Sequence, residues 1–125
     1  MENVFIDSCI VIDYIKGVPN IKNEIKKIKK PCINFIVEME LMQGANNKRE
    51  LQMIKKELRS FWRLPMKNDI AKLSTELIDF YSLSHGLTIP DGIIASTSLI
   101  FDIPLFTYNL KDFKFIPNIK LYDTN

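Results

Sequence analysis

VFIDSCIVIDYIKG, residues 4–17, has an acidic residue directly behind a short apolar run. Residues 3–6 predict a buried strand, and residues 8–16 carry apolar side chains at helical spacing until Gly17 ends the pattern. The acid, Asp7, therefore lies where a strand passes into a helix. Because a carboxylate is costly to desolvate, this position needs a reason. Asp7 either caps the helix or is one arm of a site gathered from several strand ends.

Short apolar strands alternate with amphipathic helices along the rest of the chain. Apolar runs predict strands at residues 3–6, 32–36, 62–64, 104–106 and 119–122. Helical periodicity predicts helices at residues 8–16, 20–30, 37–43, 48–61, 68–84 and 91–101. Such alternation is typical of an α/β fold with a mainly parallel sheet. A length of 125 residues, without a linker or a repeat, predicts a single domain over residues 1–125.

The composition is that of an ordinary soluble protein, with 46% hydrophobic and 26% charged residues. A net charge of +2 is too small to indicate a nucleic-acid binder by itself, and it does not exclude one. The N-terminal sequence MENVFIDS lacks the basic start and apolar core of a signal peptide. No apolar run approaches the roughly 18 residues that span a bilayer, and the two cysteines form no CxxC pair. We therefore expect a cytoplasmic protein without a membrane span.

Several acidic or amide side chains follow the predicted strands. Asp7 follows the first strand, Glu40 lies one helical turn beyond the second, Asp91 opens a helix, and Asn109 and Asp112 follow a later strand. Because ligands bind at the carboxyl ends of parallel strands, these side chains would crowd one edge of the sheet. Close like charges repel unless a cation joins them. Oxygen ligands without His or Cys favour Mg²⁺ or Mn²⁺, which serve phosphate chemistry.

Each of these residues also has a simpler interpretation. Asp7 and Asp91 are good helix caps, since their side chains can accept a backbone N–H. Glu40 taken alone is a solvent-facing helical acid, and Asn109 and Asp112 are common turn formers. Only the occurrence of the whole set on one side of the sheet favours a site over these alternatives.

Basic residues offer two candidate contacts with nucleic acid. Lys111 and Lys114 flank the proposed site, so we expect phosphate contacts there. The run KKIKK at residues 26–30 is better explained as a solvated helix face. The only histidine, His85, precedes Gly86 and predicts a helix C-terminus, where partial positive charge suits the helix dipole. A single histidine also disfavours a histidine-pair ribonuclease mechanism.

Four motifs in order along the chain carry a resemblance to a known family. They are FIDSCIVIDYIKG, INFIVEMELMQGA, IPDGIIASTSLIFDIPLFTYNLKDF and IPNIKLYD. The first joins a strand, an acid, a small polar residue and a helix, and the second has an acid followed by Leu and then Gly. The third opens a helix of small residues with Asp and ends, after a strand, on Thr, Asn and Asp-Phe. Over nearly its whole length the chain resembles the PIN-domain family, specifically the VapC-type ribonuclease toxins of toxin–antitoxin pairs.

The resemblance implies a fold and a set of site residues. The family's fold is a three-layer α/β/α sandwich around a five-stranded, mainly parallel sheet. Catalytic roles are implied at seven positions: Asp7, Ser8, Glu40, Asp91, Thr107, Asn109 and Asp112. The implied ligands of Mg²⁺ or Mn²⁺ are Asp7, Glu40 and Asp91, with either Asp112 or Asn109 as the fourth group. The hydroxyls of Ser8 and Thr107 would orient ligands and water.

The resemblance also implies an activity and partners. The expected reaction is endonucleolytic cleavage of RNA by metal-activated water. VapC-type toxins dimerise and hold an antitoxin peptide, here beside residues 21–28 and 51–61, so we expect a homodimer and a cognate antitoxin. Cys9, Val37 and Asn109 depart from the family pattern, which leaves a catalytically degenerate RNA- or protein-binding module as one alternative. A free-standing RNA-processing nuclease or a DNA-acting nuclease is a second alternative.

Overall fold

The structure is a computed structural model, and it describes residues 3–124. Its strands are β1 (Asn3–Ile6), β2 (Lys30–Ile33), β3 (Trp62–Arg63) and β4 (Leu105–Phe106). Its helices are α1 (Ser8–Ile15), α2 (Pro19–Lys26), α3 (Phe35–Gln43), α4 (Lys48–Leu58), α5 (Asn68–His85) and α6 (Ile89–Phe101), followed by the short 3₁₀ helix η1 (Leu110–Asp112). None of the helices between residues 3 and 124 is long and apolar enough to cross a bilayer.

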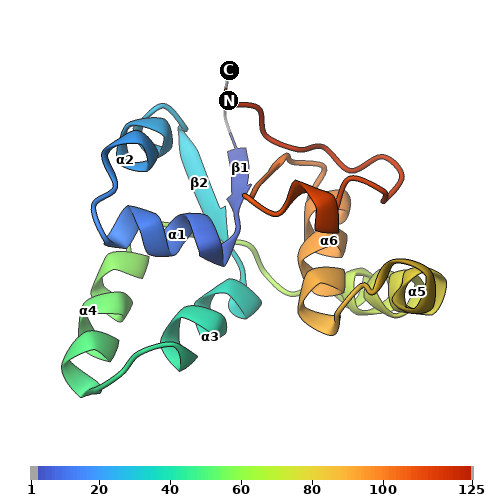
Figure 1. Cartoon of the computed structure of the whole chain (residues 1–125), viewed down its shortest axis with the longest axis horizontal. Helices are drawn as coiled ribbons and strands as arrows, with labels where there is room; N and C mark the ends of the chain where they lie inside the picture. The colour runs from blue at the N-terminus through green and yellow to red at the C-terminus, as the bar shows by residue number, and fades with distance from the viewer. Residues whose placement is uncertain (1–2, 125) are drawn as a thin grey trace.

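The strands form one parallel sheet in the order β3-β2-β1-β4. Phe5 of β1 pairs with Cys32 of β2 on one side and with Leu105 of β4 on the other. Figure 1 shows α1, α2 and α4 on one side of β1 and β2, and α5 and α6 on the other. The predicted α/β fold, a parallel sheet flanked by helices, is therefore confirmed. The strand order reverses at β1, and open α/β sheets bind ligands in the crevice at such a point.

The sheet has four strands where five were predicted, because residues 119–122 form an isolated bridge rather than a strand. The Leu105 N–H donates to the Lys120 carbonyl and the Tyr122 N–H to the Leu105 carbonyl, both at 2.8 Å. β4 is only two residues long, so it offers the last segment too little backbone for a ladder. Residues 119–122 still run parallel to β4 at Leu121, so only the length of the pairing differs from the prediction.

Side-chain caps move two predicted boundaries. Asn34 accepts the Val37 N–H and begins α3, so β2 ends at Ile33 and does not continue to residue 36. Thr88 accepts the Asp91 N–H at 3.3 Å and begins α6 before Asp91. The interpretation of Asp91 as a helix cap is therefore wrong, because Thr88 already fills that role.

The basic run at residues 26–30 is not one helix face. Lys26 ends α2, Ile28 is buried, and Lys30 begins β2. The lysines of this run therefore belong to a helix end, a turn and a strand. The prediction of a single solvated helix face here is wrong.

The C-terminus of α5 lies where the sequence indicated. His85 is its last residue, and Gly86 follows in the left-handed region at φ 68°, which glycine adopts without steric cost. The imidazole stacks on Phe115 with ring centroids 4.2 Å apart, so it also fixes the C-terminal segment against α5.

Apolar strand residues build the core, and small residues fix the position of α6. Val4, Phe5 and Ile6 are fully buried, each side chain contributing about 1.5–3 kcal/mol of hydrophobic stabilisation. On α6, Gly92 approaches α5 so closely that an added Cβ would lie 3.1 Å from Cδ1 of Ile78. This close approach sets the first turn of α6, which carries several of the polar groups described next.

Candidate active site

Asp7 ends the segment of β1 and caps α1. Its Oδ1 accepts the Ser8 N–H and its Oδ2 accepts the Thr107 hydroxyl, each at 2.8 Å. Its own N–H donates to the carbonyl of Phe106 at 2.9 Å, which ties it to β4. Asp7 is only 6% exposed. The two interpretations of Asp7 are therefore compatible, since it caps a helix and also lies at the carboxyl ends of β1 and β4.

Thr107 links Asp7 to the loop that follows β4. Its hydroxyl donates to Asp7 and accepts the Asn109 N–H at 3.0 Å, so one group fixes both the acid and the loop. The Cys9 sulfur lies 3.8 Å from Oδ2 of Asp7 and 3.7 Å from Oγ1 of Thr107. Burial, and to a lesser extent the Asp7 charge, raises the pKa of the Cys9 thiol. The thiol is therefore neutral at physiological pH and a poor nucleophile.

Glu40 lies on α3 within electrostatic reach of Asp7. Burial raises the pKa of its carboxyl, the Asp7 charge raises it further, and a hydrogen bond with the Ser8 side chain lowers it. Ser8 therefore serves both acids, through its backbone N–H to Asp7 and its side chain to Glu40.

Asp91 lies in the first turn of α6, and its carboxyl faces three other acids. The pKa of Asp91 is raised to about 6, chiefly by burial and then by the charges of Asp7, Asp112 and Glu40 in that order. A hydrogen bond with the Thr88 side chain acts in the opposite direction. Carboxylates from four separate segments thus share one small region, although they lie as far apart as residues 7 and 112 in the sequence.

The donor set suits a hard divalent cation, but it is not a closed metal cage. Between residues 3 and 124, no three His, Cys, Asp or Glu side chains are arranged so that they could hold one ion together. Mg²⁺ usually keeps several waters and takes only one or two carboxylates directly, so an open cluster is compatible with it. The charges of Asp7, Asp112 and Glu40 contribute to the raised pKa of Asp91, and a bound cation would relieve this repulsion. The residues present therefore fit Mg²⁺ or Mn²⁺.

The two candidates for the fourth metal ligand, Asn109 and Asp112, both lie in the segment after β4 and differ in their contacts. Asp112 acts on the pKa of Asp91 through its charge, whereas Asn109 is exposed and has a backbone contact with Thr107. Asp112 is thus electrostatically part of the cluster. Lys111 and Lys114 are exposed on the same loop, and their phosphate contacts stay a prediction.

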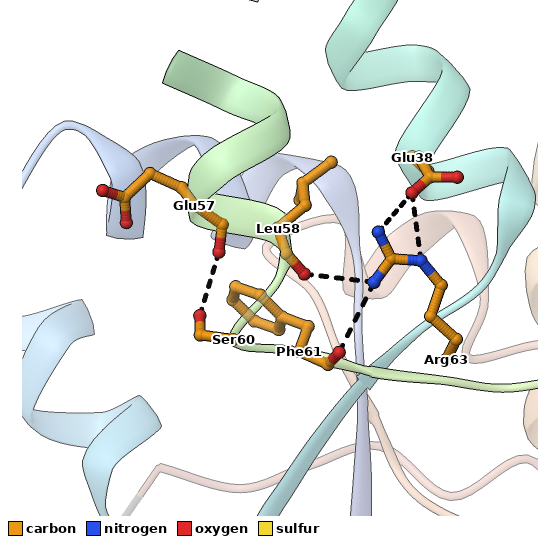
Figure 2. Close-up of polar contacts among 6 residues, drawn as sticks. All are labelled: Glu38, Glu57, Leu58, Ser60, Phe61 and Arg63. Atoms are coloured by element: carbon orange, nitrogen blue, oxygen red, sulfur yellow. Dashed lines mark hydrogen bonds and ion pairs between the residues drawn. The ribbon is translucent and has the colours of Figure 1, made fainter. Parts of the chain in front are cut away.

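An ion pair that the sequence did not predict fixes α3. The Arg63 guanidinium donates through Nε and Nη2 to Oε2 of Glu38, and through Nη1 to the carbonyls of Leu58 at 3.1 Å and Phe61 at 3.4 Å (Figure 2). Glu38 therefore joins α3 to β3 and the end of α4 through Arg63. The helix that carries Glu40 is held along its flank by this contact.

The same helix is also held at its start. Asn34 caps α3 and donates through its side-chain amide to Oγ1 of Thr97 on α6 at 3.0 Å. Both groups are buried. This bond connects the helix of Glu40 to the helix of Asp91, and nothing in the local sequence pattern indicated it.

A groove of about 480 Å³ runs beside the acidic cluster, between α1, α3 and α4. Its walls include Cys9 and Glu40 together with the apolar side chains of Ile12, Met53 and Ile54. Ile12 is 41% exposed and Met53 47% exposed, so apolar surface faces solvent here. The sequence pointed to α2 and α4 for such a groove, whereas α1 and α3 form its walls with α4.

Thr88→Ala is expected to lower the free energy of unfolding by about 1 kcal/mol, because it removes the N-cap of α6. Urea unfolding followed by circular dichroism measures this. Thr75→Ala is the matched control, since Thr75 is exposed in the interior of α5 and only bonds back to the Ala71 carbonyl. Equal losses in the two variants would contradict the assigned cap.

The fold and the site together define a class. The protein is a parallel α/β domain with acids from four segments gathered beside its central strands, at the topological switch point of the sheet. The sequence profile of the PIN domain matches residues 4–117. The chain therefore belongs to the PIN-domain family.

Characterised relatives extend over nearly the same length. The chain is 27% identical to "Ribonuclease VapC19" of Mycobacterium tuberculosis over 121 residues, covering 92% of this chain and 95% of that protein. It is 23% identical to "Ribonuclease VapC" of Rickettsia bellii, covering 96% of this chain and 75% of that protein. The predicted resemblance to VapC-type PIN domains is confirmed.

Solved structures share the fold. A toxin–antitoxin complex from Klebsiella pneumoniae contains a chain with a TM-score of 0.77 and 30% identity, over 93% of this chain and 94% of that one. A DNA-bound VapBC complex from Salmonella typhimurium has a TM-score of 0.82 over 98% of both chains, and at 23% identity it supports the fold alone.

Proposed function

We propose that this protein is a metal-dependent endoribonuclease and the toxin of a toxin–antitoxin pair. The observation that carries the proposal is the carboxyl of Asp91, whose pKa is raised first by burial and then by the charges of Asp7, Asp112 and Glu40. Four acids that repel one another call for a cation at the carboxyl edge of the sheet. The ribonuclease names of the relatives and the toxin–antitoxin complex of similar fold support the reaction and the setting.

Asp7, Glu40, Asp91 and Asp112 would hold Mg²⁺ or Mn²⁺, partly through water. When bound, such an ion lowers the pKa of coordinated water, neutralises phosphate charge and stabilises the leaving oxygen. In-line attack of water on an RNA phosphodiester would give a 5′-phosphate and a 3′-hydroxyl. A structured RNA such as tRNA or rRNA is the expected substrate.

The protein's other groups keep these acids in place and orient the substrate. Thr107 and the Ser8 N–H hold both oxygens of Asp7, so its carboxylate cannot rotate freely. The Ser8 side chain makes one hydrogen bond with Glu40. We expect Lys111 and Lys114, exposed beside the cluster, to contact the phosphates on either side of the cut.

The groove between α1, α3 and α4 supports an antitoxin partner, because it exposes apolar side chains and opens beside Glu40. A homodimer is also expected. Its support is the exposed apolar surface of α5, where Phe80 is 76% exposed and Leu83 100%. Light scattering at micromolar concentration checks the dimer. A cytoplasmic location completes the proposal.

A second candidate function is a binding module that keeps the fold but does not cut. The favouring observation is the neutral Cys9 thiol, which donates to Oδ2 of Asp7 at 3.8 Å and lies 3.7 Å from Oγ1 of Thr107. Such a module would bind metal and RNA without turnover. The next experiment separates it from the nuclease.

Cleavage of a mixture of tRNA and rRNA is expected with Mg²⁺ or Mn²⁺ and is expected to stop in EDTA, because water attack needs the cation. The protein is first freed of any bound partner and checked for folding by circular dichroism. Discrete fragments that require metal support the nuclease. Intact RNA under every metal, from folded protein, would contradict it and support the binding module.

A further inference from the structure

Tyr108 is an exposed aromatic residue inside the candidate active site. It lies between Thr107, whose hydroxyl bonds to Asp7, and Asn109, in the loop that follows β4. Half of its surface is exposed. No step of the proposed chemistry uses this ring.

The ring is held in one place. The Tyr108 hydroxyl donates to Oδ2 of Asp13 on α1 at 2.7 Å. This bond joins the loop after β4 to the helix that begins at Asp7. A ring anchored at its far end and fixed in the backbone beside Thr107 loses little freedom when a flat ligand lies on it.

A cavity of about 480 Å³ opens beside the ring, between α2 and the C-terminal segment. It is lined by aromatic and apolar side chains together with carboxylates, among them Phe106, Tyr108, Leu110, Tyr122, Glu24 and Asp123. No Lys or Arg of the described chain lines it. A phosphate finds no cationic side chain in this lining, whereas a nucleobase can stack on its aromatic rings.

We propose that Tyr108 is a stacking platform for a nucleobase of the RNA substrate, next to the phosphate that is cut. This inference rests on the proposed ribonuclease function for the identity of the strand. The sugar–phosphate backbone would pass over the acidic cluster, and the adjoining base would turn onto Tyr108 and into the cavity beside it. Single-stranded RNA is commonly held in this manner, with unstacked bases on aromatic side chains.

RNA binding in the absence of cleavage tests the platform. In an Asp91→Asn background, the affinity for a short fluorescent oligoadenylate is measured by anisotropy. Replacing Tyr108 by Ala is expected to weaken binding about tenfold, and Tyr108→Phe is expected to restore affinity to within about twofold because it keeps the ring. Trp62→Ala is the matched control, since Trp62 is 56% exposed on β3 at the opposite edge of the sheet. It is expected to leave affinity unchanged.

The Phe variant separates stacking from a purely structural role. If the tie to Asp13 were what mattered, Tyr108→Phe and Asp13→Ala would weaken binding as much as Tyr108→Ala, and the proposal would be overturned. Equal affinity of Tyr108→Ala and the parent would overturn it as well. Tyr108→Leu keeps apolar bulk without an aromatic face, and it is expected to bind more weakly than Tyr108→Phe. This comparison still decides the question if the Ala variant proves unfolded in thermal melts.

The cleavage assay gives a second, independent readout. In the active protein, Tyr108→Ala is expected to raise KM about tenfold with a smaller change in kcat, as loss of substrate binding predicts. A fall in kcat at unchanged KM would overturn the stacking role. If the wild-type protein binds oligoadenylate through Tyr108 but cuts no RNA, the nuclease proposal fails and the platform stands.

Discussion

Asp91→Asn is expected to abolish RNA cleavage and at the same time to stabilise the metal-free protein at neutral pH. Removing a group that merely supports a metal ligand often lowers activity or metal affinity about 10–100-fold, so loss of a direct ligand should exceed roughly 100-fold. The gain in stability has a separate cause. Burial disfavours the ionised carboxyl of Asp91 and the charges of Asp7, Asp112 and Glu40 repel it, whereas a neutral amide avoids both penalties.

The pH dependence of this gain follows from the direction of the pKa shift. The pKa of Asp91 is raised from 3.8 to about 6 in the folded protein. The folded state therefore binds the proton more tightly than the unfolded state, and the contribution of Asp91 to stability is lost as pH rises from about 4 through about 6. The melting temperature of Asp91→Asn should exceed that of the wild type at about pH 7.5 and match it below about pH 4. Because Asp91 is only partly buried, solvent screening limits the gain to about a few degrees.

Thermal melts in EDTA and in Mg²⁺ check both halves of this prediction. Added Mg²⁺ should stabilise the wild type more than Asp91→Asn, since binding to the folded state raises its stability in proportion to affinity. Asp79→Asn is the control, because Asp79 is exposed on α5 and is not one of the four acids of the cluster. Undiminished cleavage by Asp91→Asn, or an equal gain from Asp79→Asn, would remove Asp91 from the proposed site.

Asp7→Ala is expected to abolish cleavage and also to destabilise the fold by about 1–3 kcal/mol. The substitution removes the cap of α1 and leaves the buried Thr107 hydroxyl without its acceptor. Relief of the repulsion with Asp91 offsets part of this loss. Asp7→Asn keeps an oxygen for the Ser8 N–H, so it should retain most of the stability while losing cleavage.

Urea unfolding and the RNA cleavage assay, applied to both variants, separate the structural role of Asp7 from its chemical role. Asn47→Ala is the matched control, because Asn47 caps α4 with its side chain on the Glu50 N–H at 2.8 Å. It should lose about 1 kcal/mol of stability and keep its activity. Full cleavage by Asp7→Asn would show that Asp7 is a helix cap and nothing more.

The elements themselves were predictable because they depend on local chemistry. The buried strand at residues 3–6 and the helices α1, α4 and α5 follow from apolar spacing, and their alternation predicted the parallel sheet. The errors lie at boundaries set by side-chain caps. Asn34 and Thr88 could have been recognised as caps, since each precedes a helical pattern and can accept a backbone N–H. The prediction of a fifth strand at residues 119–122 was wrong for a different reason, because the length of that strand depends on how much of β4 is free to pair.

For the site, the sequence by itself determined which residues end strands on one side of the sheet. That rule is enough to group Asp7, Glu40, Asp91 and Asp112 as candidates, because parallel strands all point their carboxyl ends to one edge. It could not determine the contacts that hold them. The Thr107 hydroxyl reaches Asp7 across 100 residues of sequence, and Arg63 reaches Glu38 across 25. Such bonds depend on how helices and strands pack, and no local period encodes them, so only the tertiary structure decided them.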